Sequence, residues 1–341
     1  MPNLIKFPSI GQFRHCIRSV ADRAQFSGVD ENGDPVFDRA IQPPTLPVAG
    51  TVKLHGTNAG IWLDPETDKL VVQSHSRIIS VENDNQGFAR FVADREEQFR
   101  ALIKGVLPLK PGPPVLYGEF CGKGINSGCA IHQLEKFFML FGIRYGQEED
   151  TLWADLRNYR GLHSAEDRIF NIAHYPVYAM PINFAAPLKS QNELIEVTLE
   201  VEKECPVAKA LGASGIGEGV VWKIDHSDYN GPKYWFKVKG EEHNVTKVRK
   251  LAEVDVQKIE DAEKFVGAVC TEQRLLQGVA FLKEQSLPIS EKSTGNFLRW
   301  VSSDVNKEEA DTLEASGLTI KDIGRLLSTK ARVWYFNNLE E

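Results

Sequence analysis

The spacing of apolar residues changes once along this chain, near Gly240. Before that point the apolar residues stand in short runs separated by Gly, Pro, Asn and Asp, which is typical of many short strands joined by turns. After that point they recur at helical spacing, as at Val256 and Ile259. The sequence therefore predicts an α+β fold in residues 1–244, followed by a smaller all-α domain in residues 245–341.

Short β-rich runs with turns between them predict antiparallel sheets in the first part. The expected strands are residues 60–63, 69–73, 115–120, 137–143, 219–224 and 234–239. A helix is expected over residues 86–104, where Phe88, Phe91 and Phe99 fall close to one face. In the second part, helices are expected in two segments of 254–285 and over 297–302, 307–315 and 320–329, the last capped by Thr319.

The charge balance limits which polyanions the chain can bind. Its net charge is −7, and both parts are mildly acidic: residues 1–244 carry 26 Lys+Arg against 31 Asp+Glu, and residues 245–341 carry 14 against 16. Proteins that bind nucleic acid through bulk electrostatics usually show a basic excess. Any polyanion site must therefore come from a local cluster of cations.

Two further features bear on where the protein works. No apolar stretch approaches the ~18 to 20 residues of a membrane span, and the first residues lack the basic-then-apolar layout of a signal peptide. We therefore expect a cytoplasmic protein that does not enter a membrane. The five cysteines are scattered without a C-x-x-C pair, so we expect reduced, mostly buried thiols and no cysteine-based zinc site.

Several charged residues stand at the ends of the expected strands. Lys53 ends an apolar run and is followed by a polar turn, while Glu119 and Glu218 are each flanked by glycine, which lets a ligand approach the backbone closely. Lys237 and Lys239 alternate with apolar residues, so their ammonium groups lie on one face of a strand. Taken alone, each also fits an ordinary solvated strand or turn.

Taken together, these residues form an ordered series of motifs. The series is Lys53-x-His55-Gly56, Gly118-Glu119-Phe120, an aromatic run at 137–143, Glu218-Gly219-Val220-Val221-x-Lys223 and Lys237-x-Lys239. The sequence resembles the covalent nucleotidyltransferase superfamily of polynucleotide ligases and capping enzymes, and within it the RNA ligase 2 family. The likeness spans about residues 5–240 and begins with Phe7-Pro8-Ser9-Ile10-Gly11-Gln12-Phe13. It implies a nucleotidyltransferase domain of two antiparallel sheets flanked by helices.

The resemblance implies that Lys53 is the nucleophile. It would attack the α-phosphate of ATP and form lysyl-AMP with release of pyrophosphate. A lysine with a reference pKa of ~10.4 is protonated at neutral pH, so cationic neighbours or a metal must disfavour its charged form. Lys223, Lys237 and Lys239 are the available cations, and the family assigns the last two to the AMP phosphate.

The resemblance also implies a divalent metal, Mg²⁺ or Mn²⁺. Glu119 maps near the ribose and metal, and Glu218 maps onto a metal-binding residue. One or two carboxylates with phosphate oxygens suffice for Mg²⁺, which keeps several waters. Arg77 matches an arginine that would hold a phosphate by its planar fork.

The remaining expected contacts are to the nucleotide base and sugar. Phe141, in preference to Phe138, matches the aromatic residue that stacks on adenine, with Val221 covering the other face. His55, Asn58 and Lys223 complete the nucleotide-binding set. The chain has Gly142 where the family often has Asp, so one contact to the ribose or metal shell is in question.

The function implied is that of an ATP-dependent RNA ligase. It would join a 3′-hydroxyl to a 5′-phosphate at a break in RNA or an RNA-containing duplex, acting as a monomer. The helical C-terminal domain would grip the nucleic acid. Candidates for this contact are Lys247, Arg249, Lys250, Arg325, Lys330 and Arg332.

Two alternatives stay open from sequence. A capping-type guanylyltransferase uses the same lysine chemistry with GTP, but such enzymes carry a β-rich OB domain, of which no sign follows Lys239. A noncatalytic nucleic-acid-binding protein could retain the fold without the activity. Against this, a protein that had lost the activity would not need to keep Lys53, Glu119 and Glu218, yet all three are present.

Overall fold

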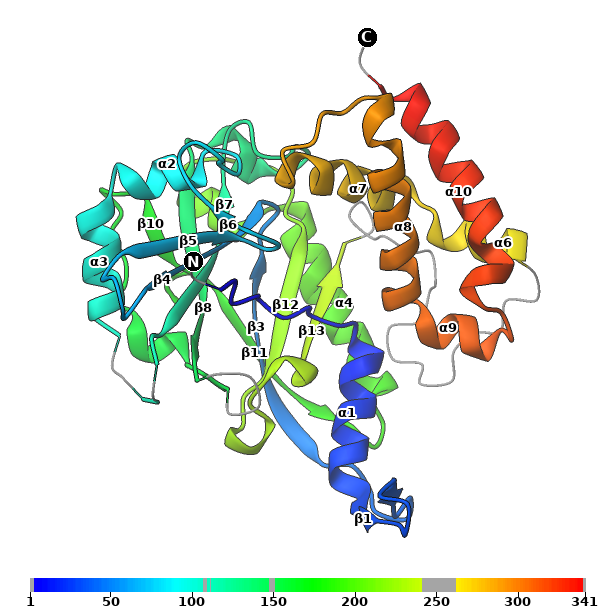
Figure 1. Ribbon diagram of the computed structural model, residues 1–341. Helices are drawn as coiled ribbons and strands as arrows, with labels where there is room; N and C mark the ends of the chain where they lie inside the picture. The colour runs from blue at the N-terminus through cyan, green and yellow to red at the C-terminus, as the bar shows by residue number, and fades with distance from the viewer. Residues whose placement is uncertain (1–2, 107–108, 111, 147–150, 241–261, 340–341) are drawn as a thin grey trace. The chain divides into compact units, whose positions relative to one another are not determined.

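The computed structural model describes residues 3–106, 109–110, 112–146, 151–240 and 262–339. The chain divides into two compact units, Met1–Gly240 and Glu241–Glu341 (Figure 1). The boundary expected at 244/245 and three of the expected RNA contacts lie outside the described residues. These three are Lys247, Arg249 and Lys250.

The first unit consists of short strands interrupted by helices. Its strands are β1 (Phe26–Val29), β2 (Pro35–Phe37), β3 (Thr45–Lys53), β4 (Thr57–Leu63), β5 (Leu70–Ser74), β6 (Ile78–Ile79), β7 (Val115–Cys121), β8 (Phe137–Tyr145), β9 (Leu152–Trp153), β10 (Ile169–Asn171), β11 (Val177–Asn183), β12 (Gly219–Ile224) and β13 (Trp235–Lys239). Its α-helices are α1 (Phe13–Gln25), α2 (Phe88–Ala93), α3 (Glu96–Lys104), α4 (Leu188–Lys203) and α5 (Pro206–Ala210). The single helix expected over 86–104 is thus two helices, separated at Asp94 and Arg95.

Two large sheets organise this unit, as expected. One has the strand order β11-β3-β12-β13, and the other has the order β10-β8-β7-β4-β5-β6, with β9 paired to β8. The pairings are antiparallel except that of β10 with β8, which is parallel. The chain between Tyr145 and Ile169 is long enough for the crossover that a parallel pair requires. The α+β fold class with antiparallel sheets is confirmed.

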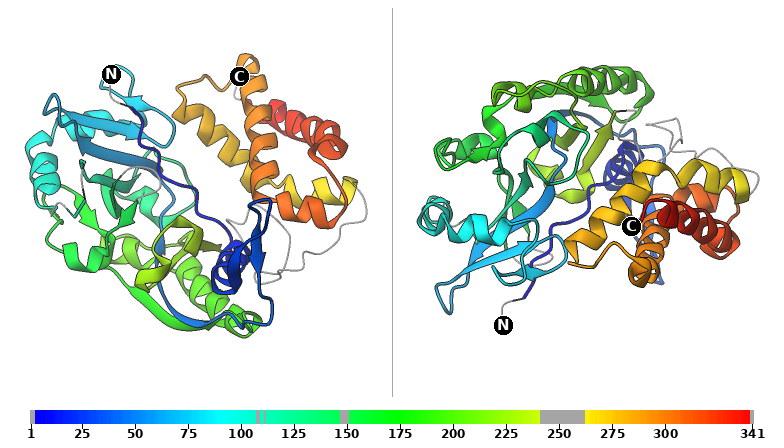
Figure 2. Two further views of the ribbon diagram at one scale, coloured as in Figure 1. Left: turned by 60° about the horizontal axis from the view of Figure 1, so that its bottom comes forward. Right: turned by 90° about the horizontal axis from the view of Figure 1, so that it is seen from above.

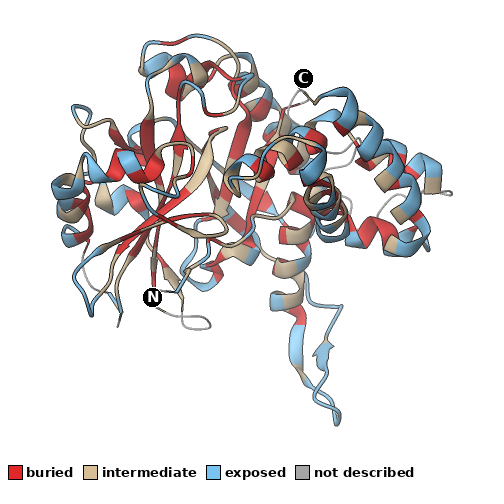
Figure 3. Cartoon of the chain, turned by 45° about the horizontal axis from the view of Figure 1, so that its top comes forward, coloured by how far each residue is buried: buried red, intermediate tan, exposed pale blue. Residues whose placement is uncertain are grey.

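Helices cover the outer face of each sheet. On the seven-stranded sheet, Phe88 of α2 packs on Phe120 and Phe138, with ring centroids 5.1 and 5.6 Å apart. On the four-stranded sheet, Phe13 of α1 packs on Phe236 at 4.6 Å. The buried positions therefore follow the strands of both sheets in Figure 3. The opposite faces look toward each other, and residues of both sheets line the candidate site between them.

The N-terminal segment joins the two sheets. The Ile5 N–H donates to Gln73 at 3.2 Å on the seven-stranded sheet, while Lys237 N–H donates to the Gly11 carbonyl at 3.0 Å on the four-stranded sheet. The segment can be followed in dark blue as it runs toward α1 (Figures 1 and 2). It places Phe7 between the sheets, where its ring contacts Phe141.

The described part of the second unit is helical. It contains α6 (Ala262–Val269), α7 (Glu272–Glu284), α8 (Thr294–Glu308), α9 (Ala310–Ala315) and α10 (Ile320–Asn337). Thr319 is the N-cap residue of α10, as expected, and its N–H donates to the Asp322 side chain at 2.7 Å, as in a capping box. Helix α8 is longer than the expected 297–302, because buried Val305 extends its apolar face.

All five cysteines are buried and none forms a disulfide. Within the residues that the structure describes, no helix has both the length and the apolar character needed to cross a membrane.

Candidate active site

The alternation of side chains along β3, β12 and β13 brings the expected lysines to one face. Lys53 and Lys239 both lie opposite Gly219 in register, on either side of β12. Val221 lies two residues further along, between Thr51 and Lys237. Because side chains two apart share a face, these residues look away from the helices and toward the other sheet.

Glu218 is the centre of a buried charge cluster. Its side chain is 2% exposed, with one carboxylate oxygen 2.6 Å from Lys53 Nζ and the other 2.9 Å from Lys239 Nζ. His55 Nδ1 lies 3.6 Å from the same carboxylate. Burial alone would raise the pKa of Glu218, but Lys239, Lys53 and His55 outweigh it and hold this pKa well below its usual value.

The same contacts hold Lys53 in its charged form. Burial lowers its pKa, but the nearby carboxylates of Glu218 and Glu119 outweigh that effect, so the pKa of Lys53 is raised. Cationic neighbours were expected to favour the neutral amine. Lys239 is indeed close, yet the carboxylate between the two lysines has the larger influence in this structure.

Glu119 and Asn58 face each other across β7 and β4. One Glu119 oxygen accepts the Gly56 N–H at 3.0 Å, and burial raises the pKa of this carboxyl to about 7, with Lys53 opposing the shift. The Asn58 Oδ1 atom is buried and has no hydrogen-bond partner among the described residues. A buried carbonyl oxygen beside a carboxylate is an oxygen-donor arrangement suited to a hard cation or to a sugar hydroxyl.

Phe141 lies at a β-bulge of β8 and faces the space between the sheets. Tyr117 pairs with Gly142 and Gly118 pairs with Leu140, so Phe141 is the extra residue of β8. Its carbonyl accepts a hydrogen bond from Lys223 Nζ at 3.2 Å. Phe138, the alternative weighed from sequence, is instead buried against α2 on the outer face.

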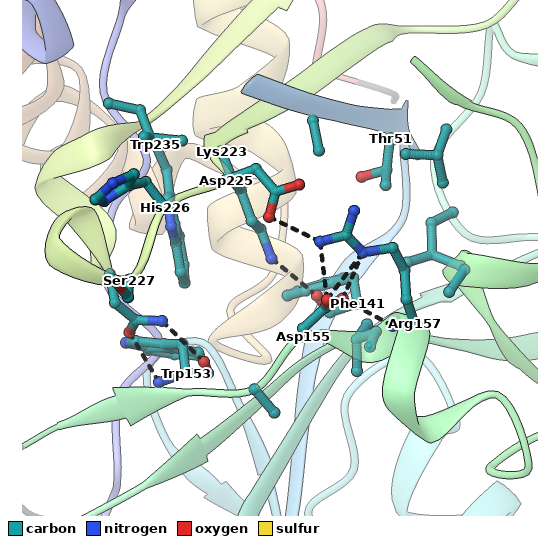
Figure 4. A pocket seen from close by; sticks show the side chains of 18 residues that line it. Thr51, Phe141, Trp153, Asp155, Arg157, Lys223, Asp225, His226, Ser227 and Trp235 are labelled. Atoms are coloured by element: carbon teal, nitrogen blue, oxygen red, sulfur yellow. Dashed lines mark hydrogen bonds and ion pairs between the residues drawn. The ribbon is translucent and has the colours of Figure 1, made fainter. Parts of the chain in front are cut away.

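A cavity of about 320 Å³ opens beside Phe141, between the two sheets (Figure 4). Its walls include Thr51 of β3, Lys223 of β12 and Trp235 of β13. Lys223 lies over the Trp235 ring, with Nζ 4.5 Å from the centroid. Burial lowers the pKa of Lys223 to about 8, and nearby Asp155 only partly opposes this. The cavity thus combines aromatic walls with one desolvated amine.

This desolvation predicts a measurable stability effect. Replacing Lys223 by Met is expected to raise the free energy of unfolding at pH 7 by about 1–3 kcal/mol, because no charge is then buried. The pKa of Lys223 in the folded protein, about 8, lies below the ordinary value of 10.5. The full free-energy cost of burying the charged amine therefore applies below pH 8. The advantage of the variant should shrink between pH 8 and 10.5, as measured by urea unfolding across that range. A variant less stable than wild type at pH 7 would contradict the prediction.

Arg77 is occupied within its own loop. Two of its guanidinium nitrogens donate to the carbonyls of Asn83 and Asp84, each at 2.9 Å. These bonds brace the segment between β6 and α2. Holding a phosphate, as expected from sequence, would require Arg77 to exchange them.

Some residues near the site were not singled out from sequence. Phe7 and Trp235 line the space around Phe141, with ring centroids 5.1 Å apart for Phe7–Phe141 and 6.2 Å for Phe7–Trp235. Trp235 could have been found, since it lies two residues before Lys237 and so shares its face. Asn126 and His132 also contact the loop after Lys53.

The family model for RNA ligases matches residues 46–239, more than half of the chain. This chain belongs to the RNA ligase family. The matched segment begins in β3 and ends at Lys239, so it contains every site residue expected from sequence.

The chain is also similar to solved structures of an RNA ligase from Naegleria gruberi. One is a lysine-to-alanine mutant with ATP and Mn and another is the protein with PPi, each 14% identical to this chain with a TM-score of 0.43. Each match covers 71% of this chain and 58% of the other, so this chain spans little more than half the length of that ligase. No curated protein matches the chain.

Proposed function

We propose that this member of the RNA ligase family is ATP-dependent and joins 3′-hydroxyl and 5′-phosphate ends of RNA through a lysyl-AMP intermediate. The observation that carries the proposal is the buried cluster of Lys53, Glu218 and Lys239 on the same sheet face as the cavity beside Phe141. A nucleophile and a base-sized cavity on one face suit a covalent nucleotide-transfer site.

The spacing along β3 supports this arrangement. Side chains two apart on a strand are ~6.7 Å apart, so Thr51 and Ala49, which line the cavity, lie about 7 and 13 Å from Lys53 along the strand. That span accommodates an extended nucleoside monophosphate. The base would lie beside Phe141 and Lys223, with the α-phosphate near Lys53 and Lys239.

The chemistry follows in three balanced steps. The neutral amine of Lys53 forms a bond to the α-phosphorus, the bond to pyrophosphate breaks, and the amine loses its proton. A 5′-phosphate oxygen of the RNA then attacks the same phosphorus, the bond between this phosphorus and the Lys53 nitrogen breaks, and the departing amine takes up a proton. Finally, the 3′-hydroxyl attacks the 5′-phosphate, releasing AMP and a proton. Lys237 and Lys239 would offset the negative charge that develops at the phosphate.

Lys53 must lose its bond to Glu218 before it can attack. In this structure the Glu218 carboxylate keeps Lys53 protonated. When nucleotide is bound, the carboxylate must therefore pair with other cations and leave Lys53. Lys239, already 2.9 Å away, is positioned to take a larger share of that charge.

The donor set fits a divalent cation shared with the nucleotide. Among the described residues no group of three or more His, Cys, Asp or Glu side chains could hold a metal alone. Glu119, Glu218 and the Asn58 carbonyl would supply protein oxygens, and phosphate oxygens would complete the shell. When bound, Mg²⁺ or Mn²⁺ would neutralise phosphate charge.

The second unit would contact the RNA. The surface of α10 carries exposed basic residues, namely Arg325, Lys330 and Arg332. The described part of this unit is helical, which does not fit the OB domain of a capping enzyme. A monomeric cytoplasmic enzyme is consistent with this proposal.

One experiment tests the function. Incubation with magnesium and α-labelled ATP should transfer label to the protein, and a nicked duplex with RNA at the 3′-hydroxyl side should then be sealed. Preference for GTP would identify a guanylyltransferase instead. Sealing of DNA ends alone, or no labelling with either nucleotide, would refute the proposal.

A further inference from the structure

The loop that carries the candidate nucleophile crosses between the two sheets. Lys53 ends β3 in one sheet, and Thr57 begins β4 in the other, so residues 54–56 lie outside both ladders. Backbone groups in such a crossing need partners from elsewhere. In this chain the partners of the His55 carbonyl and of Gly56 are side chains of one segment, which runs from β7 to the short helix η1 (Ala130–Gln133).

Three side chains of that segment bond the loop backbone. The Gly56 N–H donates to Glu119 at 3.0 Å, and the Gly56 carbonyl accepts from Asn126 Nδ2 at 2.8 Å. The His55 carbonyl accepts from His132 Nε2 at 2.7 Å. The backbone next to Lys53 is therefore held on both sides of the His55–Gly56 peptide.

Close packing removes the remaining freedom at Gly56. A Cβ atom there would lie 2.3 Å from the Phe120 carbonyl oxygen and 2.6 Å from Cys121 Sγ. No other residue fits this approach without moving β7. The loop is thus pressed against the end of β7, and Asn126 and His132 hold it there.

The backbone of the segment is built to present Asn126. Gly122, Gly124 and Gly128 have φ values of +124°, +82° and +91°, and Asn126 between them has +58°. Asn is among the few residues with a side chain that tolerate this left-handed conformation. A glycine at this position would keep the turn but could not reach the Gly56 carbonyl.

The hydrogen bonds of His132 determine its tautomer. The Cys129 N–H donates to Nδ1 at 3.1 Å, so Nδ1 carries the lone pair. Nε2 therefore carries the hydrogen that is donated to the His55 carbonyl. The His132 ring thus bonds both the backbone of its own turn, at Cys129, and the loop that follows Lys53. It also packs against the His55 ring, with ring centroids 5.5 Å apart.

We propose that His132 and Asn126 are positioning residues for Lys53, which fix the His55–Gly56 backbone so that Nζ stays aimed at the α-phosphate. This inference rests on the proposed lysyl-AMP chemistry for its kinetic consequence. A displacement of about 1 Å at a reacting group can lower a rate about 10²-fold. Neither side chain needs to touch the nucleotide for its loss to slow the first step.

Two substitutions of His132 separate this role from a purely structural one. In His132→Gln, Nε2 can still reach the His55 carbonyl, but the acceptor for Cys129 is lost. In His132→Asn, the side-chain oxygen can still accept from Cys129, but the amide is too short to reach His55. If His132 only shapes its own turn, His132→Asn should keep the wild-type rate of lysyl-AMP formation and His132→Gln should not.

The experiment measures the single-turnover rate of lysyl-AMP formation and the dissociation constant for ATP in each variant. His132→Gln should stay within about 3-fold of wild type, whereas His132→Asn should slow AMP transfer about 10- to 100-fold with ATP affinity unchanged. Asn126→Gly, which keeps the turn, should slow it by a similar factor. The inference is overturned if Asn rescues at position 132, or if neither substitution there alters the rate.

A second readout does not depend on catalysis. Hydrogen exchange at the Gly56 N–H should remain as slow in His132→Gln as in wild type and become faster in His132→Asn and Asn126→Gly. If wild type forms no lysyl-AMP but this exchange pattern holds, the proposed function fails and the backbone clamp stands. If wild type is labelled but the exchange pattern is reversed, the clamp is wrong and the function stands.

Discussion

Replacing Lys53 by Arg is expected to abolish transfer of label from ATP to the protein, by at least about 10³-fold, while leaving the fold intact. Arginine keeps a positive charge beside Glu218, which in wild type lies 2.6 Å from Lys53 Nζ. Its guanidinium stays protonated, however, and cannot act as a nucleophile. The measurement is covalent labelling with α-labelled ATP, together with the thermal midpoint of each protein.

Lys53→Met is the matched comparison. It also removes the nucleophile, but it leaves the buried Glu218 with Lys239 as its remaining ammonium partner. Labelling should be lost in both variants, whereas only Met should lower the thermal midpoint appreciably. Loss of labelling in both variants then shows that the Lys53 amine is needed for AMP transfer. The difference in thermal midpoint measures the contribution of the ion pair between residue 53 and Glu218.

A labelled Lys53→Arg protein would point to another acceptor. Lys223 is the candidate, because burial lowers its pKa to about 8 and so gives it a larger fraction of neutral amine. Reactivity alone would therefore favour Lys223. Position favours Lys53, which ends its strand beside Glu218 and Lys239, whereas Lys223 lines the cavity on the side of Phe141.

Local patterns in the sequence were sufficient for the parts of the site that depend on strand periodicity. Alternation predicted that Lys237 and Lys239 share a face, and β13 places them so. The change of spacing near Gly240 lies close to the division into two units. The strand β11, by contrast, was not predicted, because it is half exposed and contains Pro181, which weakens a strand signal.

Long-range contacts account for what the sequence pattern missed. Glu218 is 165 positions from Lys53, so the raised pKa of the lysine follows from the pairing of β12 with β3 and from no local signal. The bulge at Phe141 also depends on a long-range contact, because it arises in the pairing of β8 with β7. Asn126 and His132 act on backbone carbonyls, and such bonds leave no periodic trace along the chain.

Replacing Glu218 by Gln is expected to lower the free energy of unfolding by about 3–5 kcal/mol, which corresponds to a fall of about 6–20 °C in the thermal midpoint. Glu218 is the buried carboxylate between Lys53 and Lys239, at 2.6 and 2.9 Å. A neutral amide leaves two ammonium groups close together without their counter-charge. The same variant should slow lysyl-AMP formation by at least about 10²-fold, because it removes a carboxylate that would hold the divalent cation shared with the nucleotide.

Glu119→Gln is the matched control for the loss of stability in Glu218→Gln. Glu119 is also held inside the site, but its closest described bond is to the Gly56 N–H, which a glutamine oxygen can still accept. Its substitution should therefore lower the free energy of unfolding by less than about 1 kcal/mol. Equal losses in the two variants would show that Glu218 contributes packing and hydrogen bonding and does not balance the two lysines. A large loss for Glu218→Gln alone would establish the shared carboxylate as the element that holds this site together before nucleotide binds.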